Sequence, residues 1–174
     1  MNFGKSLRLC VLTLEKYISI DGTGDVYNYI RQLGDYKVVQ DNILKVKDHP
    51  KLYKMVGALT LQVYNIWFMP EIAQDFQDMG IDLHSHRVNY PTFLDCRVIP
   101  PAFKQKIINK LRLSKFANND HFMDAINTLN GDMTHLIPEF IEFSDTLDVK
   151  QQVDISWRDL LPEMADEMEA FVAK

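Results

Sequence analysis

The chain has 174 residues, of which 47% are hydrophobic and 11% aromatic, and its formal net charge is −5 at pH 7. This composition can fill a core and excludes a disordered chain, and the length suits one domain or the larger part of one. No basic cluster indicates a nucleic-acid-binding surface, and no apolar run reaches the roughly 20 residues that span a bilayer. We therefore expect a cytoplasmic protein that binds neither nucleic acid nor membrane.

The first residues, MNFGKSLRLCVLTLEKY, superficially resemble a signal peptide, because a lysine and an arginine precede a short apolar run. The segment has no small-residue cleavage site and runs directly into ISIDG, so we interpret it as a strand or a domain start. Cys10 and Cys96 form no CxxC pair. We expect both to be reduced, buried thiols rather than a disulfide framework.

A strand followed by a helix is predicted near the start of the chain. The β-rich segment 7–21 contains YISI, which is typical of a strand buried on both faces. Gly22 and Gly24 end this strand, and Asp25 is placed to be a helix N-cap. Helical spacing follows, with a kink or break at Gly34.

Two further strands, 54–65 and 81–91, enclose a short helical pattern at 69–80. Strand alternation places Asp82, His84 and His86 on one face of the last strand. The order strand–helix–strand–helix–strand predicts a parallel sheet with right-handed crossovers.

Residues 101–174 are predicted to be mainly helical. Helices are expected at about 102–113 and 120–129, and the remaining helical stretch is expected to break at Pro138 and Pro162. The pattern thus divides the chain into an α/β part, residues 1–100, and a helical extension, residues 101–174, that packs on it.

Several short motifs occur together in a fixed order. The stretch SIDGTGDVYNYIR is followed by YKVVQDNI, then by TLQVYNIWFMPEIAQDFQDMGIDL, VNYPTFLDCRVIPPAFKQKI and TLDVKQQVDISWRDLLPEM. In this order they resemble the radical S-adenosylmethionine (radical SAM) superfamily, in particular its twitch-domain proteins, many of them carried by phages. The residues that carry the resemblance in the first stretches are Ser19-Ile20-Asp21-Gly22, Asp25, Tyr29, Arg31, Tyr36 and Asn42-Ile43.

The resemblance implies a fold and a cofactor. The fold would be α/β, the C-terminal half of a partial (β/α)6 barrel with a helical C-terminal region. S-adenosylmethionine would lie at the strand ends beside Ser19, Asp21, Arg31, Gln62 and Asn65. The substrate pocket would include His84, His86 and Asn89.

The same resemblance implies a 4Fe-4S cluster, which radical SAM proteins bind through three cysteines in a CxxxCxxC motif. This sequence contains two cysteines and no such motif, so its residues cannot supply the three thiolates. We therefore expect a truncated or split C-terminal part that is inactive alone, with the N-terminal half supplied by another chain. Two alternatives stay open: a non-catalytic module that binds partners or forms a homodimer through an exposed sheet edge, and a decayed gene product without activity.

Each candidate residue also has a purely structural interpretation. The structural interpretation of Ser19 is internal packing, that of Asp21 is a turn with Gly22, and that of Arg31 is a surface ion pair with Asp25 or Asp35. Gln62 and Asn65, with Thr60, would be core polar groups with satisfied hydrogen bonds, and Asn89 an Asx-type turn. His84 and His86 with Asp82 have a spacing that metal sites use, but a pocket-lining role is favoured and no metal is predicted.

Overall fold

The computed structural model describes residues 14–151 and 155–173. Its sheet has three parallel strands in the order β1 (Leu14–Ser19), β2 (Leu52–Leu61) and β3 (Asp82–Arg87). The predicted parallel α/β arrangement is confirmed. The prediction that YISI is buried on both faces is wrong, because β1 is an end strand of the described sheet and its Tyr17 and Ser19 are exposed on one face. Residues 7–13 of the first predicted strand, and Cys10 with them, lie outside the described residues.

Helices connect consecutive strands and cover one face of the sheet. The chain passes from β1 to β2 through α1 (Gly24–Ile30) and α2 (Tyr36–Val46), and from β2 to β3 through α3 (Met69–Met79). Phe76 of α3 packs directly on Gly57 of β2, and the Tyr36 hydroxyl of α2 donates to Asp75 of α3. The predicted break at Gly34 is confirmed, since residues 31–35 separate α1 from α2.

The structure corrects three local predictions. Thr23, not Asp25, is the N-cap of α1, because Gly24 adopts a φ of +51° at the helix start and Asp25 falls in the first turn. The second strand ends at Leu61 rather than at residue 65, because Asn65 turns the chain by accepting a hydrogen bond from the Gln62 amide. The third ends at Arg87 rather than at residue 91, ahead of the turn that contains Pro91.

The C-terminal region is helical, as predicted. Its main helices are α4 (Pro101–Leu113), α5 (Asp120–Leu129), α6 (Ile137–Gln151), α7 (Trp157–Leu160) and α8 (Pro162–Val172). Pro138 and Pro162 lie in the first turns of α6 and α8, where the missing amide hydrogen removes no helical bond. Both prolines therefore mark helix starts.

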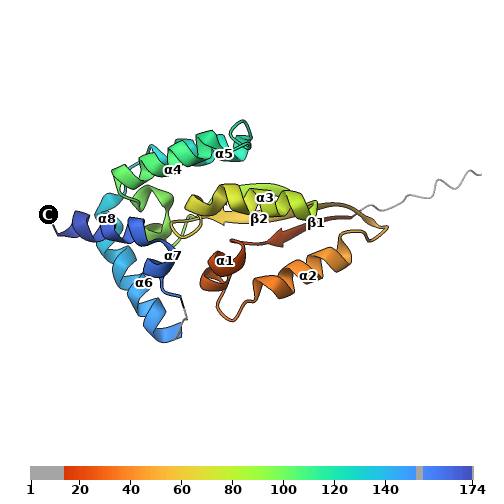
Figure 1. Ribbon diagram of the computed structural model, residues 1–174, viewed down its shortest axis with the longest axis horizontal. Coiled ribbons are helices and arrows are strands. Elements are labelled where there is room, and N and C mark those ends of the chain that lie inside the picture. Colours follow the sequence, from red (N-terminus) through yellow and green to blue (C-terminus); the bar gives the residue numbers. More distant parts are fainter. Residues whose placement is uncertain (1–13, 152–154, 174) are drawn as a thin grey trace, which may run out of the picture.

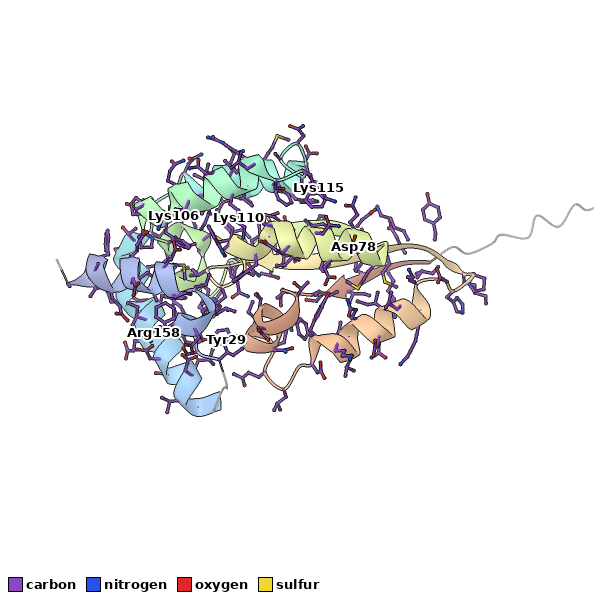
Figure 2. The ribbon with its side chains drawn as sticks, viewed as in Figure 1. Tyr29, Asp78, Lys106, Lys110, Lys115 and Arg158 are labelled. Carbon is purple, nitrogen blue, oxygen red and sulfur yellow. The ribbon has the colours of Figure 1, made fainter. Side chains whose placement is uncertain are left out.

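The helical region and the sheet share one hydrophobic core. Its buried residues include Leu59 of β2, Phe76 of α3 and Trp157 of α7. Figure 1 shows α6, α7 and α8 gathered beyond the carboxyl ends of the strands. There Tyr64 bonds Ser144 of α6 at 2.7 Å, and the Tyr29 hydroxyl of α1 donates to Asp148 at 2.9 Å (Figure 2). Burial is the main cause that raises the pKa of Tyr64 to about 12, so this tyrosine is a neutral hydrogen-bonding group at neutral pH.

Candidate functional site

The face of the sheet opposite α2 and α3 carries polar and aromatic side chains that α1, α2 and α3 leave open. Parallel register aligns the residues of the three strands on this open face in rows. The rows are Tyr17–Val56–Asp82, Ser19–Ala58–His84 and, at the carboxyl end, Thr60–His86. Tyr17, Ser19, Asp82, His84 and His86 are exposed.

Short side chains in the central strand form a shallow groove along the open face. Val56, Ala58 and Thr60 of β2 form its floor between longer side chains on β1 and β3. A cavity of about 350 Å³ occupies its lower part, lined by Tyr17, Lys54, Val56, Asp82, Leu83, His84, Asn119, Asp120 and His121. Lys54 and Asp82 form an ion pair of 2.9 Å at this end. Val56 and Ala58 give the floor two apolar side chains, whereas most of the cavity lining is polar.

A guanidinium group is fixed at the carboxyl end of β1. Arg31 donates to the Ser19 hydroxyl at 2.8 Å and forms an ion pair with Asp21 at 2.6 Å. Asp21 is buried, and its second carboxylate oxygen accepts a hydrogen bond from the Thr60 amide at 3.1 Å. Arg31 is 45% exposed at its side chain, so N–H groups remain for a ligand. Asp21 therefore orients Arg31 and ties β1 to β2, instead of presenting a free carboxylate.

Asn65 has a structural role at the same strand ends. Its amide nitrogen donates to the carbonyl of Asp21 at 2.9 Å and to that of Thr60 at 2.8 Å. Its oxygen accepts from the Gln62 amide at 2.9 Å, and both residues are buried. Asn65 thus holds the two strand ends together beneath the open face, and Gln62 lies in the turn after β2.

Three histidines gather along β3. His86 bonds the Thr60 hydroxyl at 3.2 Å, and the ring of His84 lies 5.0 Å from that of His121 in an edge-on arrangement. His121 lies in the first turn of α5, and its Nδ1 accepts a hydrogen bond from the Ser85 amide on the outer edge of β3. Burial, and then the charge of His84, lower the pKa of His121 below its ordinary value. At neutral pH His121 is therefore a neutral acceptor.

Sequence reasoning found most of this face but missed two of its residues. Ser19, Arg31, His84 and His86 lie at the open face, with Asp21 beneath them. Asn89 lies in the exposed loop beyond β3. Tyr17 and His121 were not predicted: the exposure of Tyr17 depends on the absence of a covering helix among the described residues, and His121 follows β3 by more than 30 positions. No local pattern signals either.

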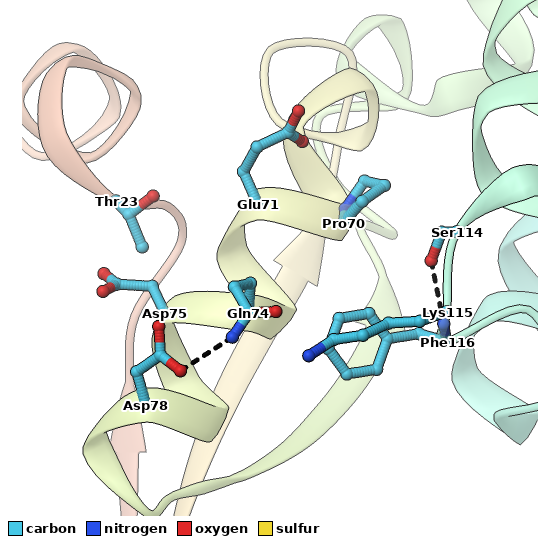
Figure 3. Close-up of a pocket in the computed structure, with 9 residues that line it drawn as sticks. All are labelled: Thr23, Pro70, Glu71, Gln74, Asp75, Asp78, Ser114, Lys115 and Phe116. Atoms are coloured by element: carbon cyan, nitrogen blue, oxygen red, sulfur yellow. Dashed lines mark hydrogen bonds between the residues drawn. The ribbon is translucent and has the colours of Figure 1, made fainter.

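A second depression, of about 520 Å³, lies across the outer side of α3. Figure 3 shows its lining, which comes from Thr23, from α3 and from residues 114–116. Its polar groups are already paired: Asp75 accepts from Tyr36, Gln74 donates to Asp78 at 2.7 Å and Lys115 donates to Gln77 at 2.6 Å. These pairs leave the depression fewer free groups for a ligand than the open face has, so we place the candidate site on the open face.

The described residues do not fit an iron-sulfur cluster or another metal centre. Within residues 14–151 and 155–173, no group of three His, Cys, Asp or Glu side chains is arranged to hold a metal ion. Cys96 is fully buried, as expected, and burial raises its pKa, so it is a protonated thiol in the core. Within the same residues, no helix has the length and apolar character needed to cross a membrane.

Comparison with known proteins gives no relative. No protein-family model, no curated protein and no solved structure matches the chain.

Proposed function

We propose that the open face binds S-adenosylmethionine and that the chain is the cofactor-binding part of a radical SAM protein. The observation that carries the proposal is the Arg31 guanidinium, held by Ser19 and Asp21 at the carboxyl end of a parallel strand. Ligands of α/β folds bind at this end of the sheet. The motif resemblance supports the same position, because its serine, aspartate and arginine meet there.

The residues of the face suit the parts of this ligand. Arg31 would bind the carboxylate of the methionine group through N–H donors not used by Ser19 and Asp21. The apolar floor formed by Val56 and Ala58 would pack against the uncharged parts of the molecule. In the complete family the bound cofactor supplies a 5′-deoxyadenosyl radical; here the residues bind and orient the ligand.

The cluster would come from residues outside these 174, on the same or on another polypeptide. The sequence has two cysteines, one of them enclosed in the core. The chain alone would therefore bind S-adenosylmethionine without cleaving it.

Calorimetric titration with S-adenosylmethionine and with 5′-methylthioadenosine, which lacks the amino-acid group, tests the proposal. Arg31→Ala is expected to weaken S-adenosylmethionine binding about tenfold or more, because a charge-assisted hydrogen bond contributes about 1.5–3 kcal/mol. The affinity for 5′-methylthioadenosine should be unchanged. Arg112→Ala, the same substitution at an exposed position of α4, is the matched control and should bind both compounds as the parent does.

Two outcomes contradict the proposal. One is a parent protein that binds neither compound at millimolar concentration. The other is an Arg31→Ala variant, folded by circular dichroism, that binds S-adenosylmethionine as tightly as the parent.

A second candidate role is a module that associates through its sheet edge. One observation favours it: among the described residues β1 is a terminal strand of the sheet, and its consecutive residues Glu15, Lys16 and Tyr17 are exposed.

A further inference from the structure

The outer edge of β1 presents backbone groups that β2 does not use. The Ile20 amide donates to the Ala58 carbonyl of β2. In a parallel strand, the backbone N–H and C=O groups of every second residue point to the same side. Ile18 and Lys16 therefore face β2 as well, and Glu15, Tyr17 and Ser19 direct their N–H and C=O groups away from the sheet. Among the described residues, no strand pairs with this edge.

The two edges of the sheet differ. On the outer edge of β3, the Ser85 amide donates to His121, and α5 lies beside the strand. The edge of β1 has no such helix among the described residues, and its Tyr17 side chain is 60% exposed. β1 is thus the edge at which a further strand can add by β-augmentation.

We propose that this strand is the β1 of a second copy, paired antiparallel about a two-fold axis at Tyr17. Tyr17 then exchanges both hydrogen bonds with the partner's Tyr17, and Glu15 pairs with the partner's Ser19. Both copies use residues whose backbone groups point outward, so six hydrogen bonds form. In this register no two like charges stand directly opposite each other. A register centred on Lys16 would place the two lysines opposite each other, and one centred on Glu15 would do the same with the two glutamates, which is unfavourable.

Charge complementarity favours the same register. The Ser19 hydroxyl accepts from Arg31, whose guanidinium is partly exposed. The partner's Glu15 lies opposite Ser19 and on the same face, so its carboxylate reaches Arg31. In the ligand-free dimer this carboxylate occupies the donors that the proposed ligand carboxylate would take, so ligand binding and this contact compete for Arg31. Arg31 has only one carboxylate among its ion pairs in the described residues, that of Asp21. Two such contacts form, one at each end of the paired strands.

The dimer joins the two sheets into one of six strands. A two-fold axis perpendicular to the sheet keeps both open faces on the same side. The covering helices α2 and α3 of both copies lie on the other side. A contact of one short strand pair is small, so we expect a reversible dimer of the weak, transient class.

Sedimentation velocity over a range of protein concentrations tests the proposal without ligand. Tyr17→Pro removes an outward amide and leaves the β2 ladder intact, since an edge strand tolerates proline where the amide points outward. The variant should remain monomeric where the parent dimerises. Glu15→Lys should weaken association about tenfold or more, because it places a lysine beside Arg31. Glu142→Lys, an equal change of charge at an exposed position of α6, should dimerise as the parent does.

Crosslinking tests the register. In a Cys10→Ser background, Tyr17→Cys should crosslink to its own copy with a short bismaleimide, and Leu113→Cys, also strongly exposed, should not. A parent that is monomeric at all concentrations, or that dimerises equally with Tyr17→Pro, overturns the proposal; residues 1–13 of the same chain would then be the next occupant of the edge to test. Failure of S-adenosylmethionine binding leaves this result unaffected, because no ligand is present.

Discussion

The two faces of the sheet are built from alternate residues of the same three strands, yet they differ in what they contact. On the covered face, Gly57 and Leu59 are buried beneath α2 and α3. On the open face, Tyr17, His84 and His86 are exposed. The polar side chains there bond to one another, as His86 does to Thr60. The comparison separates stability from recognition: one face supplies packing energy, and the other presents chemical groups.

Truncation of one aromatic residue on each face gives the largest expected contrast. Phe76→Ala removes a fully buried ring and should lower the free energy of unfolding by about 3–5 kcal/mol. Tyr17→Ala removes an exposed ring and should change it by about 0.5 kcal/mol or less. Urea denaturation at a protein concentration too low for association measures both. Equal effects would show that the open face is packed in solution.

Two neighbouring residues of β2 sharpen the comparison. A methyl group at Gly57 would lie 2.2 Å from the Phe76 ring, so Gly57→Ala should destabilise the protein by about 1–3 kcal/mol. Ala58→Ser, one position along and on the open face, should change stability by about 0.5 kcal/mol or less. The measurement is again urea denaturation, and a Gly57→Ala variant as stable as the parent would contradict the close contact between β2 and α3.

Asp21 contributes both to stability and to the proposed ligand binding, because it is buried and also orients Arg31. Asp21→Asn weakens an ion pair and a backbone hydrogen bond and should cost about 1–2 kcal/mol of stability. The affinity for S-adenosylmethionine should fall as well. Asp25→Asn, an equal change at an exposed position of α1, should change neither quantity by more than about 0.5–1 kcal/mol. If Asp25→Asn weakens binding as strongly as Asp21→Asn, Asp21 has no special role.

The smallest expected effect is the pH response of His121. Its pKa in the folded state lies below the ordinary value of 6.5, because burial and the charge of His84 disfavour the protonated ring. The unfolded state therefore binds more protons just below pH 6.5, and stability falls as pH falls through this window. NMR titration should find the His121 pKa below 6.5, and His84→Ala should raise it. A pKa at or above 6.5 in the parent would falsify this assignment.

The sequence predicted the parallel sheet because its signals are local. The β-branched and aromatic run YISI predicts a strand, although not the exposure of its Tyr17 and Ser19, and glycine or proline residues stand at most element boundaries. The end of β2 was placed too late, because Val63 and Tyr64 are apolar and buried although they lie in the turn that follows the strand. An apolar residue that is buried in a turn looks the same in the sequence as an apolar residue that is buried in a strand.

The candidate site was predicted in part for a related reason. Ser19, His84 and His86 follow from strand alternation and strand ends, which the sequence records directly, whereas Arg31, the C-cap of α1, was proposed from the motif resemblance. The partners of Arg31 did not follow: a surface pair with Asp25 or Asp35 was expected, and the chain pairs it with Asp21, which is nearer to it only in the folded structure. The contribution of His121 required the packing of α5 beside β3, a long-range contact that no local pattern encodes.

An NMR titration of the isotopically labelled protein with S-adenosylmethionine tests the central claim, that the open face is the binding face, most directly. The account predicts shifts of the amide resonances of Ser19, Ala58, Thr60 and His84. Resonances of α2 and of the outer side of α3 should remain in place, because the sheet separates them from the ligand. Shifts confined to the depression over α3, at Gln74, Asp78 and Lys115, or no shifts at saturating ligand, would contradict it.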